Sequence, residues 1–300
     1  MNDSKKLDIR QSSPSDLRET ASCAPSVVGI QRVPRFSPNS VDKDLAILRA
    51  VMSRFGGRIV PEDNIPAISE LCNKAPEVVF SMARSEEALD ILARLERQGS
   101  LVINSAKGVR NCQRSTLDTM MRSNGIPIPS SDDGDGNGYW LKRGDQAAQS
   151  HGDVVFCKDR EALASALEAF HSRGITDYIV QPHVKGDLVK FYGVSPMAIG
   201  NDREEDFFRT FYPSDDGQSK FGDERINGKA RHYTFDTDAL RSTAARVAAI
   251  TGVAVFGGDA IIKEDGSFVI IDFNDWPSFS RCRDDAADAI AALKSKRHDN

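Results

Sequence analysis

The sequence predicts a small parallel α/β domain at about residues 26–104, followed by an α+β region with antiparallel sheets at about residues 105–300. Three observations favour this architecture. Before Asn104, short apolar runs alternate with segments whose apolar residues recur at helical spacing, which is typical of a parallel sheet. After Gly138 the chain is rich in strands, with few helices between them. Near its end, the dipeptide Asp265-Gly266 stands between two apolar runs and is a strong β-hairpin signal.

The elements of the first region follow from periodicity. Residues 1–25 are rich in Ser, Pro and charge, and we expect a disordered tail there. The expected strands are 27–30, 78–80 and 101–103, and the expected helices are 41–55 and a segment from Ser85 with Glu86 and Glu87 in its first turn.

The second region begins with an expected helix at 111–123, which Asn124-Gly125 ends. A polar turn region at 130–138 follows it. The expected strands are 139–143, 154–157, 178–184, 188–194, 207–212, 253–262 and 268–273; the expected helices are 160–172, 237–251 and a closing helix from Arg283.

Composition restricts the function. The formal net charge is −5 and the isoelectric point is near 5.6, which argues against nucleic acid as the main partner. No apolar run reaches the length of about 18 residues that a membrane span needs. The cysteines at 23, 72, 112, 157 and 282 are scattered without a C-x-x-C motif, which favours reduced thiols and a cytoplasmic location.

The predicted hairpin carries the most informative residues. A two-residue loop at Asp265-Gly266 places Asp259 directly opposite Asp272, with Cβ atoms roughly 4.5–5.5 Å apart. Asn274 lies two residues beyond Asp272 and faces the same side. Two facing carboxylates among apolar neighbours need a cation, and oxygen ligands suit Mg²⁺. The alternative is a solvated hairpin end whose aspartates cap a turn.

Two lysines interrupt strands elsewhere. Lys142 precedes a small, polar stretch at 144–152 whose backbone N–H groups could close over an anion. Lys190 follows the segment from Gln181 to Val184, in which Pro182 removes a backbone donor. Both features also fit a simple structural role: a hairpin loop with a lysine that reaches to solvent, and an edge strand.

The order of these features resembles the ATP-grasp family over roughly residues 106–293. The hairpin pattern of Asp259 followed by Asp272, Asn274 and Pro277 carries most of the resemblance. It implies two antiparallel subdomains, at about 105–195 and 196–300, that grip ATP between them, after a preceding α/β domain at 26–104. The chain is similar to the group of ribosomal S6 modification enzymes and D-alanine ligases.

The resemblance also implies residue roles. Asp259, Asp272 and Asn274 match the Mg²⁺ (or Mn²⁺) ligands. The implied ATP-binding residues are Arg114, Lys142, the adenine hinge Gln181, Pro182, His183 and Val184, the ribose-binding Asp187, and Lys190, which is also placed to meet the substrate as a catalytic residue. Apart from the resemblance, Arg209 and Arg281 are candidate catalytic residues that anchor the substrate, because guanidinium pairs bidentately with carboxylate or phosphate; the alternative is that both are surface arginines. The chain departs from the pattern in having Asp272 where many members have Glu and Ser278 where Gly is common.

We therefore expect an Mg-ATP-dependent ligase that activates a small-molecule carboxylate as an acyl phosphate for attack by an amine or thiol. The alternative is a small-molecule kinase of the inositol-phosphate kinase type on the same scaffold. A third reading is a nucleotide-binding module without catalysis. The expected partners are small-molecule substrates, with no nucleic acid and no membrane, and a homodimer stays open as an assembly.

Overall fold

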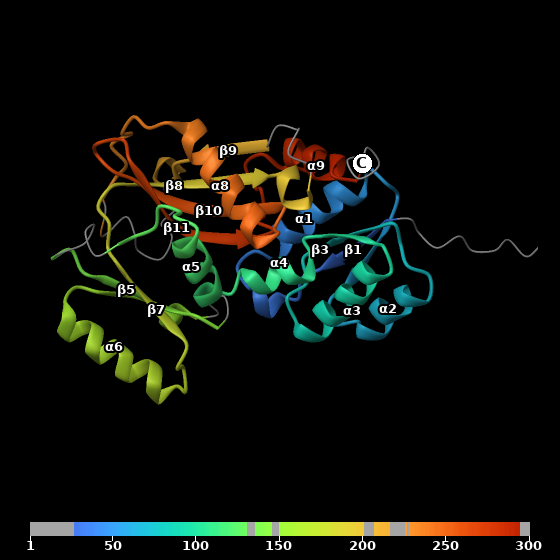
Figure 1. Cartoon of the computed structure of the whole chain (residues 1–300), viewed down its shortest axis with the longest axis horizontal. Coiled ribbons are helices and arrows are strands. Elements are labelled where there is room, and N and C mark those ends of the chain that lie inside the picture. Colours follow the sequence, from blue (N-terminus) through green and yellow to red (C-terminus); the bar gives the residue numbers. More distant parts are fainter. Residues whose placement is uncertain are drawn as a thin grey trace, which may run out of the picture.

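Three sheets organise the chain in a computed structural model (Figure 1), which describes residues 27–130, 136–145, 150–200, 207–216, 226 and 228–294. The expected disordered tail lies outside the described residues. In Figure 1 the first sheet lies at the right, the second at the lower left and the third above them. The N-terminal α/β prediction and the antiparallel sheets that follow are both confirmed.

The first sheet is parallel, with strand order β2-β1-β3-β4. Its strands are β1 (Val27–Gln31), β2 (Arg58–Pro61), β3 (Val78–Ser81) and β4 (Leu101–Ile103); its helices are α1 (Val41–Met52), α2 (Ile65–Glu70) and α3 (Glu86–Arg97). Strand β2 and helix α2 were not among the expected elements. Strand β2 has only one buried residue, Val60, so its apolar signal is weak.

The second sheet is antiparallel, with order β6-β5-β7. It consists of β5 (Tyr139–Arg143), β6 (Val154–Cys157) and β7 (Tyr178–Pro182), and α6 (Arg160–Ser172) packs on it through Phe170. The helix expected at 111–123 is α5 (Arg114–Ser123), and a short helix before it, α4 (Ala106–Asn111), was not predicted.

The third sheet is antiparallel, with order β11-β10-β8-β9. Its strands are β8 (Asp187–Val194), β9 (Phe207–Phe211), β10 (Val255–Ile262) and β11 (Phe268–Asp275), and its helices are α8 (Thr237–Thr251) and α9 (Arg283–Ala292). Every residue of β10 is buried. Helices α5 and α8 cover the apolar side, where Leu117 and Leu240 share a core with Phe191.

The third sheet is joined firmly to the parallel sheet. Helix α9 packs beside α1, as Figure 1 shows, and both contribute to one apolar core. The Asn104 side chain donates to the Val255 carbonyl and accepts from its N–H, both over 2.8 Å. The Trp276 indole N–H donates to the carbonyl of Ile103 over 3.2 Å. These contacts hold the end of β11 against the N-terminal region; the predicted domain boundaries themselves stay a prediction.

Two expectations from composition can be compared with the described residues. Cys72, Cys112, Cys157 and Cys282 are all free thiols, as expected. Within the same described part of the chain, no helix is long and apolar enough to cross a membrane.

Candidate active site

Strands β10 and β11 form the expected hairpin, but its loop differs from the expectation. The Lys263 N–H donates to the Ser267 carbonyl over 2.8 Å, so the loop has three residues, and Gly266 ends it at φ +81°. The predicted two-residue loop is therefore wrong. A type I′ loop would also need positive φ at Asp265, which that residue does not have.

The two aspartates oppose each other nevertheless. A β-bulge interrupts the ladder, so that Asp259 pairs with Asp272 while Ala260 pairs with Ile270. The extra residue is Ile271, which has no partner on β10. The longer loop shifts the register by one residue and the bulge shifts it back. The predicted pairing is thus confirmed, although the loop that predicted it is not the one present.

The face that carries this pair is open and rich in oxygen atoms. The Asn274 amide donates to Asp272 Oδ2 over 3.1 Å, which confirms that both side chains lie on one face. Gly257 is opposite Asn274, and Pro277 and Tyr192 pack closely against it. On the next strand, Lys190 is paired with Asp259 and places its ammonium 2.9 Å from Asp259 Oδ1. Part of the positive charge that the two carboxylates require is therefore supplied by this lysine.

The donor set at this face fits Mg²⁺. Two carboxylates and an amide oxygen are the hard ligands that this ion prefers, and it normally keeps further positions for phosphates and water. In the described part of the chain no cluster of three or more His, Cys, Asp or Glu side chains is placed to hold a metal. Asp259 and Asp272 would be two acidic ligands of such an ion, and Asn274 a third, neutral one.

Lys142 connects the two antiparallel sheets. It projects from β5, is 8% exposed, and donates to Gln181 Oε1 over 2.8 Å and to the Ile271 carbonyl over 2.9 Å. The second acceptor belongs to the bulged residue, whose carbonyl turns toward the lysine. The Gln181 amide in turn donates to Asp118 over 3.1 Å. The bulge therefore restores the aspartate pairing and also holds an ammonium group beside the aspartates.

The segment from Gln181 to Val184 connects the second sheet to the third. Pro182 ends the edge strand β7, where its missing N–H costs no ladder bond. The His183 N–H donates to the Gly138 carbonyl, and its ring accepts from the Trp140 indole over 3.1 Å. Val184 packs against Ile261 and Val269 of the hairpin. Buried contacts with both sheets thus fix the position of this connecting segment, called the crossing below.

A cavity of about 750 Å³ lies between these elements and reaches the parallel sheet. It brings together most of the residues that the sequence predicted for the site: Arg114, Lys142, Gln181, Pro182, His183, Val184, Lys190, Asp259, Asp272 and Asn274. Its volume is of the size that small-molecule and cofactor sites have. Residues predicted from separate parts of the sequence thus share one concave site.

Three predicted residues do not line this cavity. Both carboxylate oxygens of Asp187 accept backbone N–H groups, from Arg231 over 2.7 Å and from Tyr233 over 2.9 Å. Asp187 is therefore occupied in fixing that segment. The Arg209 guanidinium lies over the Phe207 ring, and that of Arg281 lies over the Phe211 ring.

The stretch predicted to cover phosphates is only partly described. Residues 146–149 lie outside the described part of the chain. On its near side, the Gly144 N–H donates to the Asp177 carbonyl over 2.9 Å. On its far side, Ser150 lines the cavity. The stretch thus ends at the site, and its role stays a prediction.

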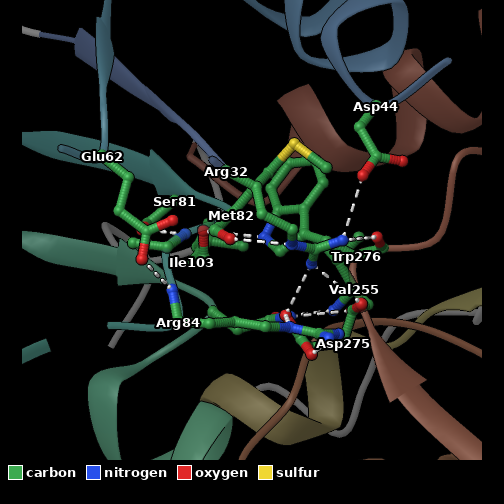
Figure 2. A network of polar contacts seen from close by, with 12 residues as sticks. Arg32, Asp44, Glu62, Ser81, Met82, Arg84, Ile103, Val255, Asp275 and Trp276 are labelled. Atoms are coloured by element: carbon green, nitrogen blue, oxygen red, sulfur yellow. Dashed lines mark hydrogen bonds and ion pairs between the residues drawn. The ribbon is translucent and has the colours of Figure 1, made fainter. Parts of the chain in front are cut away.

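A buried ionic network that was not predicted from the sequence lies where the cavity reaches the parallel sheet (Figure 2). Asp275, directly after Asn274, accepts from two arginines: Arg32 of the β1–α1 connection, 3.0 Å away, and Arg84, which follows β3, at 2.5 Å. Arg32 also binds Asp44 over 3.2 Å, and Glu62 accepts the backbone N–H of Arg84 over 2.7 Å. No local motif predicts this network, because its members come from five separate places in the chain.

The network controls the charge of its carboxylates in opposite ways. Burial would raise the pKa of Asp275, but the ion pairs with Arg84 and Arg32 outweigh it and hold that pKa below its ordinary value. Burial dominates at Asp44, and its pKa is raised even though Arg32 is adjacent. Burial also raises the pKa of the Cys112 thiol near this network, so this cysteine is no thiolate nucleophile at neutral pH.

The loop after β11 closes the cavity with strained backbone. Trp276 and Phe279 have φ values of +40° and +46°, which are uncommon for bulky residues. Both side chains are completely buried, so packing holds the strain. Between and after them, Ser278 and Ser280 line the cavity. The loop thus has a defined shape with two hydroxyl side chains at the site.

Comparison with solved structures identifies the fold. The ATP-grasp ligase PsnB in complex with a minimal precursor is 15% identical with a TM-score of 0.58, over 90% of this chain and 99% of that one. D-alanine-D-alanine ligase from Coxiella burnetii is 10% identical with a TM-score of 0.59, over 91% and 96%. A RimK domain ATP-grasp protein from Sphaerobacter thermophilus DSM 20745 is 18% identical with a TM-score of 0.57, over 90% and 99%.

The chain therefore has the ATP-grasp fold, as its hairpin pattern predicted. No protein-family model matches the sequence, and a search of curated proteins by sequence finds no match. At these identities the structural likeness concerns the fold, and the function must be argued from the site itself.

Proposed function

We propose that the protein is an Mg-ATP-dependent, ADP-forming ligase that activates a carboxylate as an acyl phosphate for attack by an amine or thiol. One observation carries the proposal: the cations Lys142 and Lys190 converge with Asp259, Asp272 and Asn274 in one cavity large enough for a nucleotide and a second substrate. All three solved structures described above are of ATP-grasp proteins, and two of them are named as ligases.

The chain's residues would divide the work of binding ATP. Adenine would lie at the crossing from Gln181 to Val184, between the two antiparallel sheets. Lys142 and Lys190 would meet the phosphates, with Arg114 beside them at the start of α5. When bound at Asp259, Asp272 and Asn274, Mg²⁺ would neutralise charge on the phosphates and orient them. Little covalent chemistry is then required of the protein, because positioning and charge stabilisation dominate phosphoryl transfer.

The proposed reaction has two steps. An oxygen of the acceptor carboxylate attacks the γ-phosphorus of ATP, the bond to the β-phosphate oxygen breaks, and ADP leaves. The amine or thiol then attacks the acyl carbon, inorganic phosphate leaves with the electron pair of the broken C–O bond, and the nucleophile loses its proton to solvent. A closed cavity protects the acyl phosphate from water between the two steps. Lys190, beside Asp259, is the residue we assign to the phosphoryl group in transit.

A trapping assay tests the proposal. Hydroxylamine is a small nucleophile that converts an acyl phosphate to a stable hydroxamate. We expect a panel of small carboxylic acids to yield hydroxamate and ADP in equal amounts, only with protein, Mg²⁺ and ATP all present. An Asp288→Asn variant should give the same yield as wild type, because this aspartate is 73% exposed, pairs with Arg54 and does not line the cavity. Release of AMP, or Mg-ATP binding without any turnover across the panel, would contradict the proposal.

The kinase alternative is not favoured by the comparisons, whose named activities are ligations. The same assay separates the two functions. A kinase leaves a phosphate ester that survives hydroxylamine and needs no second nucleophile.

A further inference from the structure

Two arginines bind the same buried carboxylate, Asp275, but they use their donors differently. A guanidinium has five N–H donors. Arg32 directs all of them to acceptors, namely the Met82 carbonyl, the Asp44 carboxylate, the Trp276 carbonyl, and both the carboxylate and the carbonyl of Asp275. Its side chain is 4% exposed. Arg32 is therefore a structural arginine whose donors are all occupied.

Arg84 is different. Only its Nε and Nη2 atoms donate within the described part of the chain, and both bind Asp275. The side chain is 16% exposed, and the residue lines the cavity. Its Nη1 atom makes no hydrogen bond within the described part of the chain, and it is not a buried atom. Because Arg84 lines the cavity, this atom is accessible there. The two-point contact with Asp275 holds the guanidinium still, and its remaining N–H groups are available to a ligand.

The surroundings of Arg84 favour an anionic ligand. Besides the two arginines, the part of the cavity beside the parallel sheet is lined by the exposed Lys43. The acids there, Asp44 and Asp275, are already bound to Arg32. The other polar lining residues at this end are uncharged: Ser37, Asn39, Ser40, Ser278 and Ser280. An oxyanion placed there would meet a fixed guanidinium, a lysine and several hydroxyl groups.

Position then suggests what the anion is. Asp275, which holds Arg84, directly follows the metal-face residue Asn274 in β11, and all three residues line the same cavity. The reacting carboxylate must lie at the metal face, next to the phosphate. An anion at Arg84 is thus a second, non-reacting group on the same small molecule.

We infer that Arg84 is a specificity-determining residue that binds a second anionic group of the acceptor, so that the acceptor is a dicarboxylic acid or another acid with two anionic groups. The inference rests on the proposed function for the identity of the reacting group. The binding of the second anion can be measured without turnover.

The experiment compares succinate with butyrate, which has the same carbon count and one carboxylate fewer. Binding to the full chain is measured by calorimetry with Mg²⁺ and a non-hydrolysable ATP analogue, and hydroxamate formation is measured with ATP. We expect wild-type protein to prefer succinate at least about 10-fold in both assays, as charged hydrogen bonds imply. Arg84→Met should abolish the preference and leave the affinity for the ATP analogue unchanged.

Two further variants make the test decisive. Arg84→Lys keeps a cation on Asp275 and lacks the fork, so it should fold like wild type and retain only part of the preference. Arg110→Met removes an arginine that pairs with Glu86 and Asp90 on the surface, and should keep the full preference. Equal binding of succinate and butyrate to wild type, or an unchanged preference in Arg84→Met and Arg84→Lys, would overturn the inference. Preferential binding of succinate without hydroxamate would support the role of Arg84 and contradict the ligase proposal.

Discussion

Strand β11 carries two carboxylates in opposite circumstances. Asp272 lies on the open face of the cavity, opposite Asp259, and accepts a hydrogen bond from the neutral amide of Asn274 on the same strand. Asp275, three residues later, is 2% exposed and bound by Arg32 and Arg84. Lys190 pairs with Asp259 at the open face, whereas two arginines bind the single buried carboxylate of Asp275. The same residue type is thus a candidate ligand in one place and a structural anchor in the other.

The largest expected effect is at the open face. Asp272→Asn should lower Mg-ATP-dependent turnover about 1000-fold or more, because metal stabilisation of transferring phosphate is worth several kcal/mol. The free energy of unfolding should stay equal or rise slightly, since one of two facing like charges is removed. Steady-state kinetics and urea unfolding check the two parts.

The contrast would fail if Asp272→Asn kept wild-type turnover and lost stability instead. Asn274→Ala should reproduce the kinetic loss, because its amide oxygen belongs to the same donor set. A Mg²⁺-dependent thermal shift with ADP, present in wild type and absent in both variants, links the loss to the metal face.

The second effect is at the buried anchor. Asp275→Asn removes the charge that two buried arginines share, and removing one partner of a buried ion pair costs about 3–5 kcal/mol. We expect that loss in the free energy of unfolding, measured by urea titration at neutral pH. Asp288→Asn, at an exposed pair, should cost less than about 1 kcal/mol. A loss at Asp275 no larger than at Asp288 would mean that the arginines find other partners.

The third effect is a pH dependence of stability, in which two acids of the buried network, Asp275 and Asp44, act with opposite signs. The pKa of Asp275 in the folded chain lies below its ordinary value. As the pH falls, the unfolded chain therefore takes up a proton at this carboxyl before the folded chain does. The contribution of Asp275 to stability is thus present above about pH 3.9. It is lost as the pH falls through the folded pKa. Asp44 has a raised pKa and contributes with the opposite sign, losing stability as the pH rises through its titration.

Comparing wild type with Asp275→Asn isolates the first of these contributions, because Asp44 is present in both. The stability difference between the two proteins should be constant from pH 7 to 5 and shrink steadily below pH 4. Unfolding free energies from urea titrations at each pH check this. A difference that stayed constant to pH 2.5 would show that the arginines do not lower the pKa of Asp275.

How much of this could be predicted from sequence depended on how local each signal was. The hairpin and the shared face of Asp272 and Asn274 follow from signals within one short segment, and the structure has both. The pairing of Asp259 with Asp272 agrees with the prediction only because the bulge compensates for the longer loop. The bulge at Ile271 could not be predicted, because no residue type marks it and its carbonyl is used by Lys142 from another sheet. Asp187 was assigned by its order along the chain, and Arg209 and Arg281 by their side-chain chemistry. Neither criterion shows where a side chain points. The pairing of Arg32 and Arg84 with Asp275 joins residues about 190 to 240 positions apart, and only the folded chain brings them together.

The smallest effect concerns the hairpin loop that positions the open face. Gly266 at φ +81° is the left-handed third residue of the loop, and a Cβ there would also lie 2.8 Å from the Thr234 carbonyl oxygen. Gly266→Ala should therefore cost about 1–2 kcal/mol of stability. Turnover should change little, because the bulge sets the pairing of Asp259 with Asp272 independently of the loop's conformation. Urea unfolding and kinetics of the same variant decide the point: a large loss of turnover at a small loss of stability would show that the loop, and not the bulge, fixes the metal face.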